Sequence, residues 1–304
     1  MLLRSPSVRR ALSTLVPYNP PLNIVRMPAS STLHDFAYTH QKFARGNLPK
    51  VVMIHGGPGS HKDFKYLNSA WLNLPGPKPD LVTVDLPGYG ESTPKLHEPS
   101  ADNFAALCLE GLETAGVKPP FIVVGHSLGG HVALSAAQHS AVVGVGFCCG
   151  VSVSEHHAVK PFKVNKALGE ASKHPLFKYL TIPFLSAFYR LAGFPSGLSF
   201  DTIAYVHQRI AALNFAAARQ NAVDVAVPWV LLYTLDDHLI ESPIFKEMAM
   251  VVGDGAAPGG SVDERQGVVV EFEKGGHNIQ KTQAAGISEA IVAMWRKHWV
   301  PAIL

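Results

Sequence analysis

The feature that most constrains this chain is a serine held between two glycines, in the run FIVVGHSLGG at residues 121–130. The apolar residues at the start of the run predict a buried strand, and the alanine-rich segment 127–138 predicts a helix. A sharp strand-to-helix turn of the form Gly-x-Ser-x-Gly projects its serine from the end of a sheet. Gly125 and Gly129 have no Cβ, so the helix can start against the strand without collision. We therefore predict that Ser127 is a nucleophile; an ordinary glycine-rich turn is the alternative.

Length and composition limit the classes of protein that this chain can belong to. Its 304 residues are enough for one large α/β domain, with or without an insertion. A hydrophobic content of 47% with 16% charged residues predicts a compact protein with a sizeable core. No uncharged apolar run approaches the roughly 18 residues of a membrane span. The net charge of +3 is small and no basic run stands out, so nucleic acid is not an expected partner.

Three cysteines do not make a disulfide framework, and Cys148 and Cys149 stand side by side in an apolar run. We expect them to be buried and reduced. None lies beside a glycine-rich turn, so a cysteine nucleophile is not predicted.

The first twenty residues differ in composition from the remainder of the chain. Arg4, Arg9 and Arg10 stand among serines, and no acidic residue occurs before Asp35. This composition is typical of a mitochondrial transit peptide, and residues 10–13 resemble a matrix-processing site. We expect a mitochondrial protein; a disordered basic tail on a cytoplasmic protein is the alternative.

Strand patterns alternate with helix patterns over most of the chain. Alternation of this kind predicts a mostly parallel sheet with helices on both faces. Helices are expected from about residue 100, over 127–138 and from 280 onward. The eight predicted strands lie at residues 22–27, 32–40, 50–55, 81–85, 121–124, 141–149, 228–235 and 268–272.

The segment 152–227 interrupts the alternation and is too long for a loop. It carries helical spacing and ten aromatic residues, which predict a helical cap inserted over the site. Most of these aromatics should pack the cap on the main domain, and a few should line an apolar pocket. Contact of the cap with a membrane surface is a further interpretation. The predicted division is therefore a tail (1–20), a core in two parts (21–151 and 228–304) and the cap (152–227). The aromatics are Phe162, Phe177, Tyr179, Phe184, Phe188, Tyr189, Phe194, Phe200, Tyr205 and Phe215.

Three phrases together resemble the α/β-hydrolase superfamily: the turn around Ser127, His-Gly-Gly-Pro-Gly at 55–59 and Asp-Leu-Pro-Gly-Tyr-Gly-Glu-Ser at 85–92. The resemblance implies an eight-stranded, mostly parallel sheet with an inserted helical cap. It also implies that the loop at 55–59 supplies a backbone N–H to a developing oxyanion. Pro58 has no N–H, so Gly57 is the candidate donor, and Leu128, after the nucleophile, is the second. His55 is expected to be structural.

The resemblance also implies positions for an acid and a base. The base follows the last strand, where Gly-Gly-His places His277. The acid follows the strand at 228–235, where Asp237 fits best; Asp236 remains an alternative and Glu155 a third. The order Ser, acid, His is the one that this fold uses. Three other histidines receive no chemical role: His126 and His131 are expected to pack, and His238 to face solvent.

These residues predict a serine hydrolase that cleaves a carboxylic ester or thioester with an apolar acyl group through an acyl-enzyme. The alternatives are an amide or peptide hydrolase, a C–C bond hydrolase and a non-catalytic ligand-binding homologue. Serine at the nucleophile position argues against haloalkane dehalogenases and epoxide hydrolases, which use aspartate there. No phosphate loop, dinucleotide motif or metal-ligand spacing is present, so no cofactor or metal is expected. The expected partner is a small apolar ester; the oligomeric state is left open.

Overall fold

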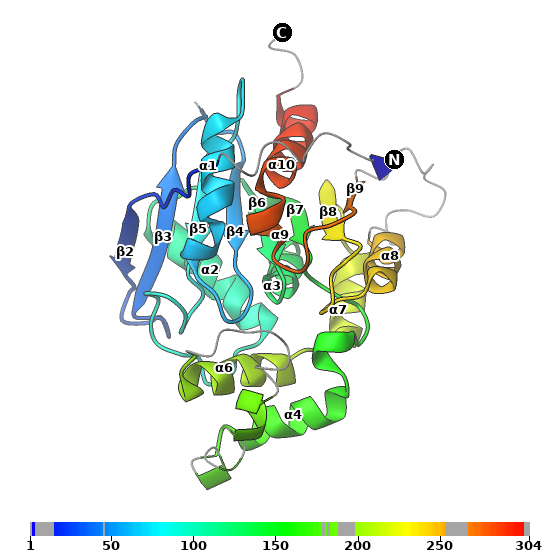
Figure 1. Ribbon diagram of the computed structural model, residues 1–304. Coiled ribbons are helices and arrows are strands. Elements are labelled where there is room, and N and C mark those ends of the chain that lie inside the picture. Colours follow the sequence, from blue (N-terminus) through cyan, green and yellow to red (C-terminus); the bar gives the residue numbers. More distant parts are fainter. Residues whose placement is uncertain are drawn as a thin grey trace.

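The computed structural model describes residues 2–3, 15–44, 46–174, 176–177, 180, 183–187, 198–252 and 267–300. Its centre is a sheet whose strands run in the order β1-β9-β8-β7-β6-β4-β5-β3-β2 (Figure 1). All eight predicted strands are confirmed, as β2 to β9; the two-residue β1, paired with β9, was not predicted. The strands are β1 (Leu2–Leu3), β2 (Leu22–Arg26), β3 (Asp35–Gln41), β4 (Lys50–Ile54), β5 (Leu81–Val84), β6 (Phe121–His126), β7 (Val142–Cys148), β8 (Trp229–Thr234) and β9 (Gly267–Phe272).

Only the β2–β3 and β3–β5 pairs are antiparallel; the other neighbouring strands of the sheet run parallel. At the centre, Val52 of β4 lies beside Val82 of β5 and Val123 of β6. Strands β5, β6 and β8 are buried along their whole length, which is why their sequences read as continuous apolar runs. The parallel strands therefore end together at one edge of the sheet.

Helices cover both faces of the sheet, as predicted. On one face α1 packs against α10 and α9, and on the other α2, α3, α7 and α8 pack in sequence (Figure 1). Ser100 begins α2, since its side chain accepts a hydrogen bond from Asn103 N at 3.2 Å. The helices are α1 (Lys65–Asn73), α2 (Ala101–Thr114), α3 (Gly129–Ala136), α7 (Phe215–Val223), α8 (Ser242–Val251), α9 (Ile279–Thr282) and α10 (Ala284–Trp299), with the 3₁₀ turn η3 (His61–Phe64).

The segment expected to form the cap holds the turn η4 (His157–Val159) and the helices α4 (Phe162–Ala171) and α6 (Phe200–Ala211). Helices α4 and α6 pack against each other at the end of the molecule opposite the C-terminus (Figure 1). A Cβ on Gly169 would lie 2.5 Å from the carbonyl oxygen of His207, so this crossing requires glycine. Helix α7, inside the same predicted range, packs instead against α3 and α8. Four cap aromatics lie outside the described residues: Tyr179, Phe188, Tyr189 and Phe194.

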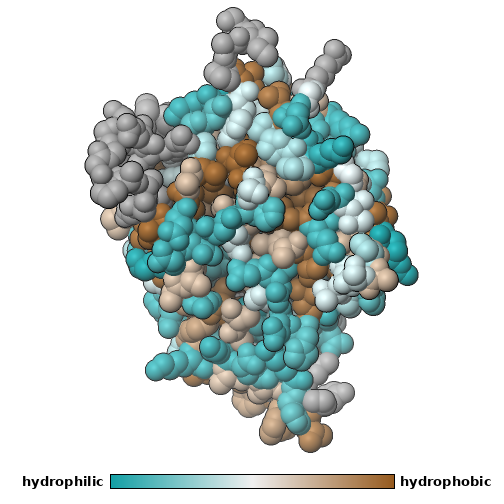
Figure 2. All heavy atoms as spheres, turned by 180° about the vertical axis from the view of Figure 1, so that it is seen from behind, coloured by the Kyte–Doolittle hydropathy of each residue, from teal (hydrophilic) through white to brown (hydrophobic). Residues whose placement is uncertain are grey.

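Apolar side chains remain exposed on the cap, where Leu176, Leu180 and Phe184 are each more than half exposed. Figure 2 shows hydrophobic side chains at the lower end of the molecule, the end where the cap lies. Cys148 and Cys149 are buried free thiols, as the sequence predicts. In the part of the chain that the structure describes, no helix has the length and apolar character needed to cross a membrane.

Candidate active site

The turn between β6 and α3 holds Ser127 in a conformation that few non-glycine residues adopt, with a φ of 53°. Glycines on both sides allow this geometry. A Cβ on Gly125 would lie 2.1 Å from the carbonyl oxygen of Gly129, and one on Gly129 would lie 2.5 Å from that of Ile54. The backbone N–H of Ser127 donates to Cys148 O on the neighbouring strand at 3.2 Å. The local sequence therefore presents the serine at the carboxyl edge of the sheet.

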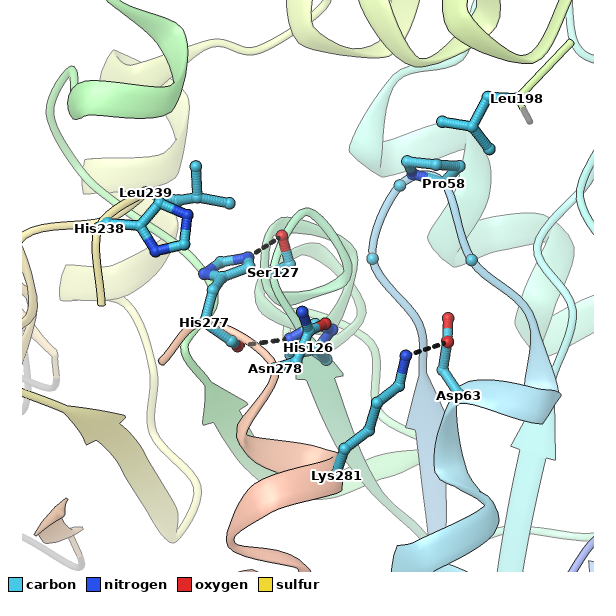
Figure 3. Close-up of a pocket in the computed structure, with 13 residues that line it drawn as sticks. Pro58, Asp63, His126, Ser127, Leu198, His238, Leu239, His277, Asn278 and Lys281 are labelled. Carbon is cyan, nitrogen blue, oxygen red and sulfur yellow. Dashed lines mark hydrogen bonds and ion pairs between the residues drawn. The ribbon is translucent and has the colours of Figure 1, made fainter. Parts of the chain in front are cut away.

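His277 reaches this serine from the turn after β9. Its Nε2 lies 2.8 Å from Ser127 Oγ, and the residue is buried (Figure 3). Two contacts hold the backbone of this turn: Thr234 Oγ1 donates to Gly276 O at 3.0 Å, and His126 Nε2 donates to His277 O at 3.0 Å. His126, expected only to pack, therefore also positions the backbone of the candidate base.

Asp237 lies on the far side of the His277 ring. Its Oδ2 is 2.8 Å from His277 Nδ1, while Oδ1 accepts from Leu239 N at 2.9 Å and Ile240 N at 3.1 Å. Burial opposes ionisation of this carboxyl, but the contact with His277 and the two N–H groups outweigh it, so the pKa of Asp237 is lowered. The ionised carboxylate assigns the proton of neutral His277 to Nδ1 and leaves Nε2 free to accept from Ser127.

The alternative acids lie elsewhere. Asp236 accepts from Gly276 N at 2.8 Å and from Gly275 N at 3.2 Å, so it binds the loop that carries His277 and not the imidazole. Glu155 is exposed. The structure thus brings Asp237 together with Ser127 and His277, and gives Asp236 a supporting position.

The two candidate oxyanion donors come from segments that touch. A Cβ on Gly56 would lie 2.8 Å from Ser127 Cβ, and one on Gly57 would lie 3.2 Å from Leu128 Cδ1. Among the described residues, neither the Gly57 nor the Leu128 N–H has a hydrogen-bond partner. Both donors are therefore free to bind an oxygen near Ser127.

His55 holds the loop at 55–59 in place. Its Nε2 accepts from Leu86 N at 3.0 Å, so its Nδ1 carries the proton and donates to Gly56 O at 2.6 Å. Burial is the main cause that lowers the pKa of His55 to about 4, and the ring is neutral at neutral pH. The expectation of a structural role for His55 agrees with these contacts.

A cavity of about 550 Å³ opens over Ser127 and His277. Apolar side chains, Leu198 and Leu239, lie toward its cap side, and an ion pair between Lys281 Nζ and Asp63 Oδ1, 3.0 Å long, lies toward the opposite end (Figure 3). His238 is exposed, as expected, but also lines the cavity. The described lining residues are Gly56, Gly57, Pro58, Gly59, Asp63, His126, Ser127, Leu198, His238, Leu239, His277, Asn278 and Lys281.

Sequence reasoning missed several of these lining residues. Asp63, Lys281 and Leu198 stand in no recognisable motif and meet only through the fold. The expected aromatic lining is absent from the described part of this wall, to which the cap contributes Leu198. Within the described ranges, no group of three or more His, Cys, Asp or Glu side chains is placed to hold a metal ion.

Comparison with known proteins identifies the family. The model of the alpha/beta hydrolase family matches residues 51–290, and the chain belongs to this family. A monoacylglycerol lipase, abhd6-B of Xenopus laevis, is 32% identical over 183 residues, which cover 55% of this chain and 48% of that protein. The 2-succinyl-6-hydroxy-2,4-cyclohexadiene-1-carboxylate synthase of Escherichia coli O7:K1 is 29% identical over 120 residues, which cover 40% of this chain and 43% of that protein. The matches thus span about half the length of these relatives, or less.

Solved structures share the fold. A thermophilic esterase from Thermogutta terrifontis superimposes with a TM-score of 0.65 at 15% identity, over 90% of this chain and 98% of that one. At this level of identity the likeness concerns the fold alone. The chain is thus a hydrolase of the alpha/beta hydrolase family, and proteins named as lipases and esterases are among those that it resembles.

Proposed function

We propose that this chain is a serine hydrolase that cleaves a carboxylic ester or thioester through an acyl-enzyme intermediate. The observation that carries the proposal is the continuous series of contacts from Asp237 through His277 to Ser127, 2.8 Å at each step. A nucleophile, a base and an orienting acid in this geometry are the requirements for acyl transfer. A protein that only binds ligands has no need of the three together.

In the first half-reaction, Ser127 Oγ attacks the acyl carbon while His277 Nε2 takes the hydroxyl proton. The carbonyl oxygen becomes an oxyanion, which accepts from the N–H groups of Gly57 and Leu128. The tetrahedral intermediate then expels the alcohol or thiol, to which His277 returns the proton. In the second half-reaction, water gives a proton to His277 and attacks the acyl carbon; His277 then returns the proton to Ser127 Oγ as its bond to the acyl carbon breaks, which releases the acid.

The apolar wall of the cavity supports an apolar acyl group. Leu198, Leu239 and Pro58 line the cavity that opens over the serine, and methylene groups of a substrate lose water contact there. The name of the Xenopus laevis relative, a monoacylglycerol lipase, agrees with such substrates. An amide or C–C bond hydrolase uses the same three residues, and the series of leaving groups tested below distinguishes amide cleavage from ester cleavage.

Labelling with an alkyl fluorophosphonate, followed by intact mass spectrometry, tests the proposal. Wild type should gain one adduct, Ser127→Ala none, and His277→Ala should react more slowly by about 10²-fold or more. A matched series of an ester, a thioester and an amide with one acyl chain then compares leaving groups. Folded wild type that neither reacts with the probe nor cleaves any member of the series would contradict the proposal.

The exposed apolar residues of the cap support a further, smaller proposal, that the cap contacts a lipid surface. Co-sedimentation with phosphatidylcholine vesicles should fall when Leu176 and Phe184 are both replaced by serine. Equal sedimentation of the two proteins would contradict it.

A further inference from the structure

A buried cation on the cap has no anionic partner among the residues that the structure describes. Arg209 of α6 is 3% exposed, and its guanidinium lies over the rings of Phe104, 4.9 Å away, and Tyr89, 5.7 Å away. Among the described residues, neither terminal nitrogen of Arg209 has a hydrogen-bond partner, and the buried hydroxyl of Tyr89 has none either. The described part of the chain thus leaves three polar atoms without a hydrogen-bond partner of good geometry, and the guanidinium of Arg209 lies close enough to the Tyr89 hydroxyl to interact with it.

The ionisable groups that surround Arg209 do not neutralise it. Burial lowers the pKa of His55 to about 4 and that of His131 to about 3, and it raises the pKa of Cys108 to about 12. Burial also raises the pKa of Tyr205, so all four groups are uncharged at neutral pH.

The carboxylate of Asp85 binds other groups, because it accepts from His61 N and Nδ1 and from Glu91 N. Among the described residues, no carboxylate forms an ion pair with Arg209.

Stacking on the two aromatic rings stabilises the charge of the guanidinium but gives its N–H groups no acceptor. A ring stabilises a guanidinium through its face, whereas the N–H groups point outward in the plane of the guanidinium. Buried donors left without an acceptor destabilise a fold, and an unpaired buried charge does so more strongly. An acceptor supplied by a ligand would satisfy the terminal nitrogens of Arg209 and the hydroxyl of Tyr89 together.

The cluster adjoins the loop that carries a candidate oxyanion donor. A Cβ on Gly57 would lie 3.5 Å from the Tyr89 hydroxyl and 3.4 Å from Val206 Cγ1. Val206 and Arg209 are three residues apart on α6, so they share one face of this helix. Tyr205 anchors the same helix, since its hydroxyl donates to Pro87 O and accepts from Leu96 N, both at 2.9 Å. Helix α6 therefore holds the cation beside the loop that carries Gly57, and Gly57 itself lines the cavity over Ser127.

We propose that Arg209 and Tyr89 form a carboxylate-binding subsite, which takes an acyl group that is apolar along its length and ends in a carboxylate. Arg209 donates two N–H groups to the carboxylate oxygens, a geometry that fits a planar fork. Tyr89 donates its hydroxyl to the same group. This inference rests on the proposed ester hydrolysis and specifies its substrate class as the half-esters or half-thioesters of dicarboxylic acids.

Paired substrates test the subsite. The 4-methylumbelliferyl half-esters of adipic and pimelic acid are compared with the hexanoate and heptanoate esters, after subtraction of the rate in buffer. The measured quantity is the ratio of kcat/KM for the charged ester to that for the neutral ester of equal length. A ratio cancels any general loss of folded enzyme in a variant.

The wild-type ratio should exceed one and should fall at least about tenfold in Arg209→Met, as expected for loss of a charge-assisted hydrogen bond. Arg209→Lys should retain part of the preference, because it keeps the charge without the fork. Tyr89→Phe should lower the ratio less than Arg209→Met does. Arg219→Met is the matched control: Arg219 is a half-exposed arginine of α7 that pairs with Glu247, and its loss should leave the ratio unchanged.

Two results would overturn the subsite while leaving the proposed function standing. One is a wild-type ratio of one or less at both chain lengths, and the other is an equal ratio in wild type and Arg209→Met. If wild type cleaves no ester and Ser127 stays unlabelled, the hydrolase proposal fails by itself. Titration calorimetry with adipate then tests the subsite. Adipate should bind to wild type and should not bind to Arg209→Met.

Discussion

Replacement of Asp237 by asparagine separates the orienting role of this residue from its shape. In Asp237→Asn, the amide oxygen can keep the hydrogen bonds from Leu239 N and Ile240 N, which now go to Asp237 Oδ1. The amide nitrogen then faces His277 Nδ1 and must donate to it. The imidazole is forced into the tautomer that carries its proton on Nε2, which points at Ser127 and can no longer accept the serine proton.

The wrong tautomer blocks proton transfer and leaves the nucleophile and the N–H donors in place. We expect kcat to fall by about 10⁴-fold, the loss seen for this change in an unrelated serine hydrolase, which corresponds to about 5.5 kcal/mol in the activation free energy. The unfolding midpoint should change little, since both backbone hydrogen bonds persist.

The assay is steady-state hydrolysis of a 4-nitrophenyl ester, together with the rate of fluorophosphonate labelling. Asp236→Asn is the matched control, because it keeps an acceptor for Gly276 N and does not touch the imidazole. This variant should lose less than about tenfold in kcat, which is the effect expected when one neutral hydrogen bond is weakened. If Asp236→Asn lost more activity than Asp237→Asn, the assignment of the acid and the tautomer reasoning would both be refuted.

Three further predictions concern stability and targeting. Burial lowers the pKa of His131 to about 3, so the unfolded chain binds a proton that the folded chain excludes, and stability is lost as the pH falls from about 6.5 toward 3. In His131→Gln this loss should shrink by up to about 1.4 kcal/mol per pH unit, measured by urea unfolding at pH 7 and pH 5. Gly125→Ala should lower the melting temperature more than Gly116→Ala, because its Cβ would lie 2.1 Å from Gly129 O; a Cβ on Gly116 has nothing within 4 Å and adds only the strain of a φ of 70°, about 1 kcal/mol. Residues 1–20 fused to a fluorescent protein should direct it to mitochondria, as an Arg-rich, acid-free segment does.

Each of these predictions has an outcome that contradicts it. Equal pH dependence in wild type and His131→Gln would mean that His131 titrates alike in the folded and unfolded chain. A similar melting temperature for the two alanine variants would show that the turn at Ser127 tolerates a Cβ. A diffuse fusion protein would leave the basic segment without a targeting role.

Much of the fold and the chemistry could be read from local patterns. Most of the parallel strands are short apolar runs next to glycine or proline, as β4 is after Pro49 and β6 after Pro120, so their positions follow from the local pattern. Ser127 and His277 stand in glycine-containing turns, and such turns are recognisable because few other residues permit their backbone geometry. These features depend on residues that are adjacent in the sequence, so they can be predicted from the sequence alone.

Two features could be established only from the tertiary structure: which of two adjacent aspartates contacts His277, and which side chains from distant segments surround Arg209. The sequence favours Asp237 and leaves Asp236 open, and the turn after β8 directs only Asp237 to the imidazole. Arg209 reads as an ordinary polar residue of an amphipathic helix. It is buried against Tyr89 only because α6 packs over the Gly57 loop. In the described chain, its terminal nitrogens have no hydrogen-bond partner of good geometry. Burial and charge compensation are set by residues far apart in sequence, so no local pattern could have shown that this cation lacks a partner.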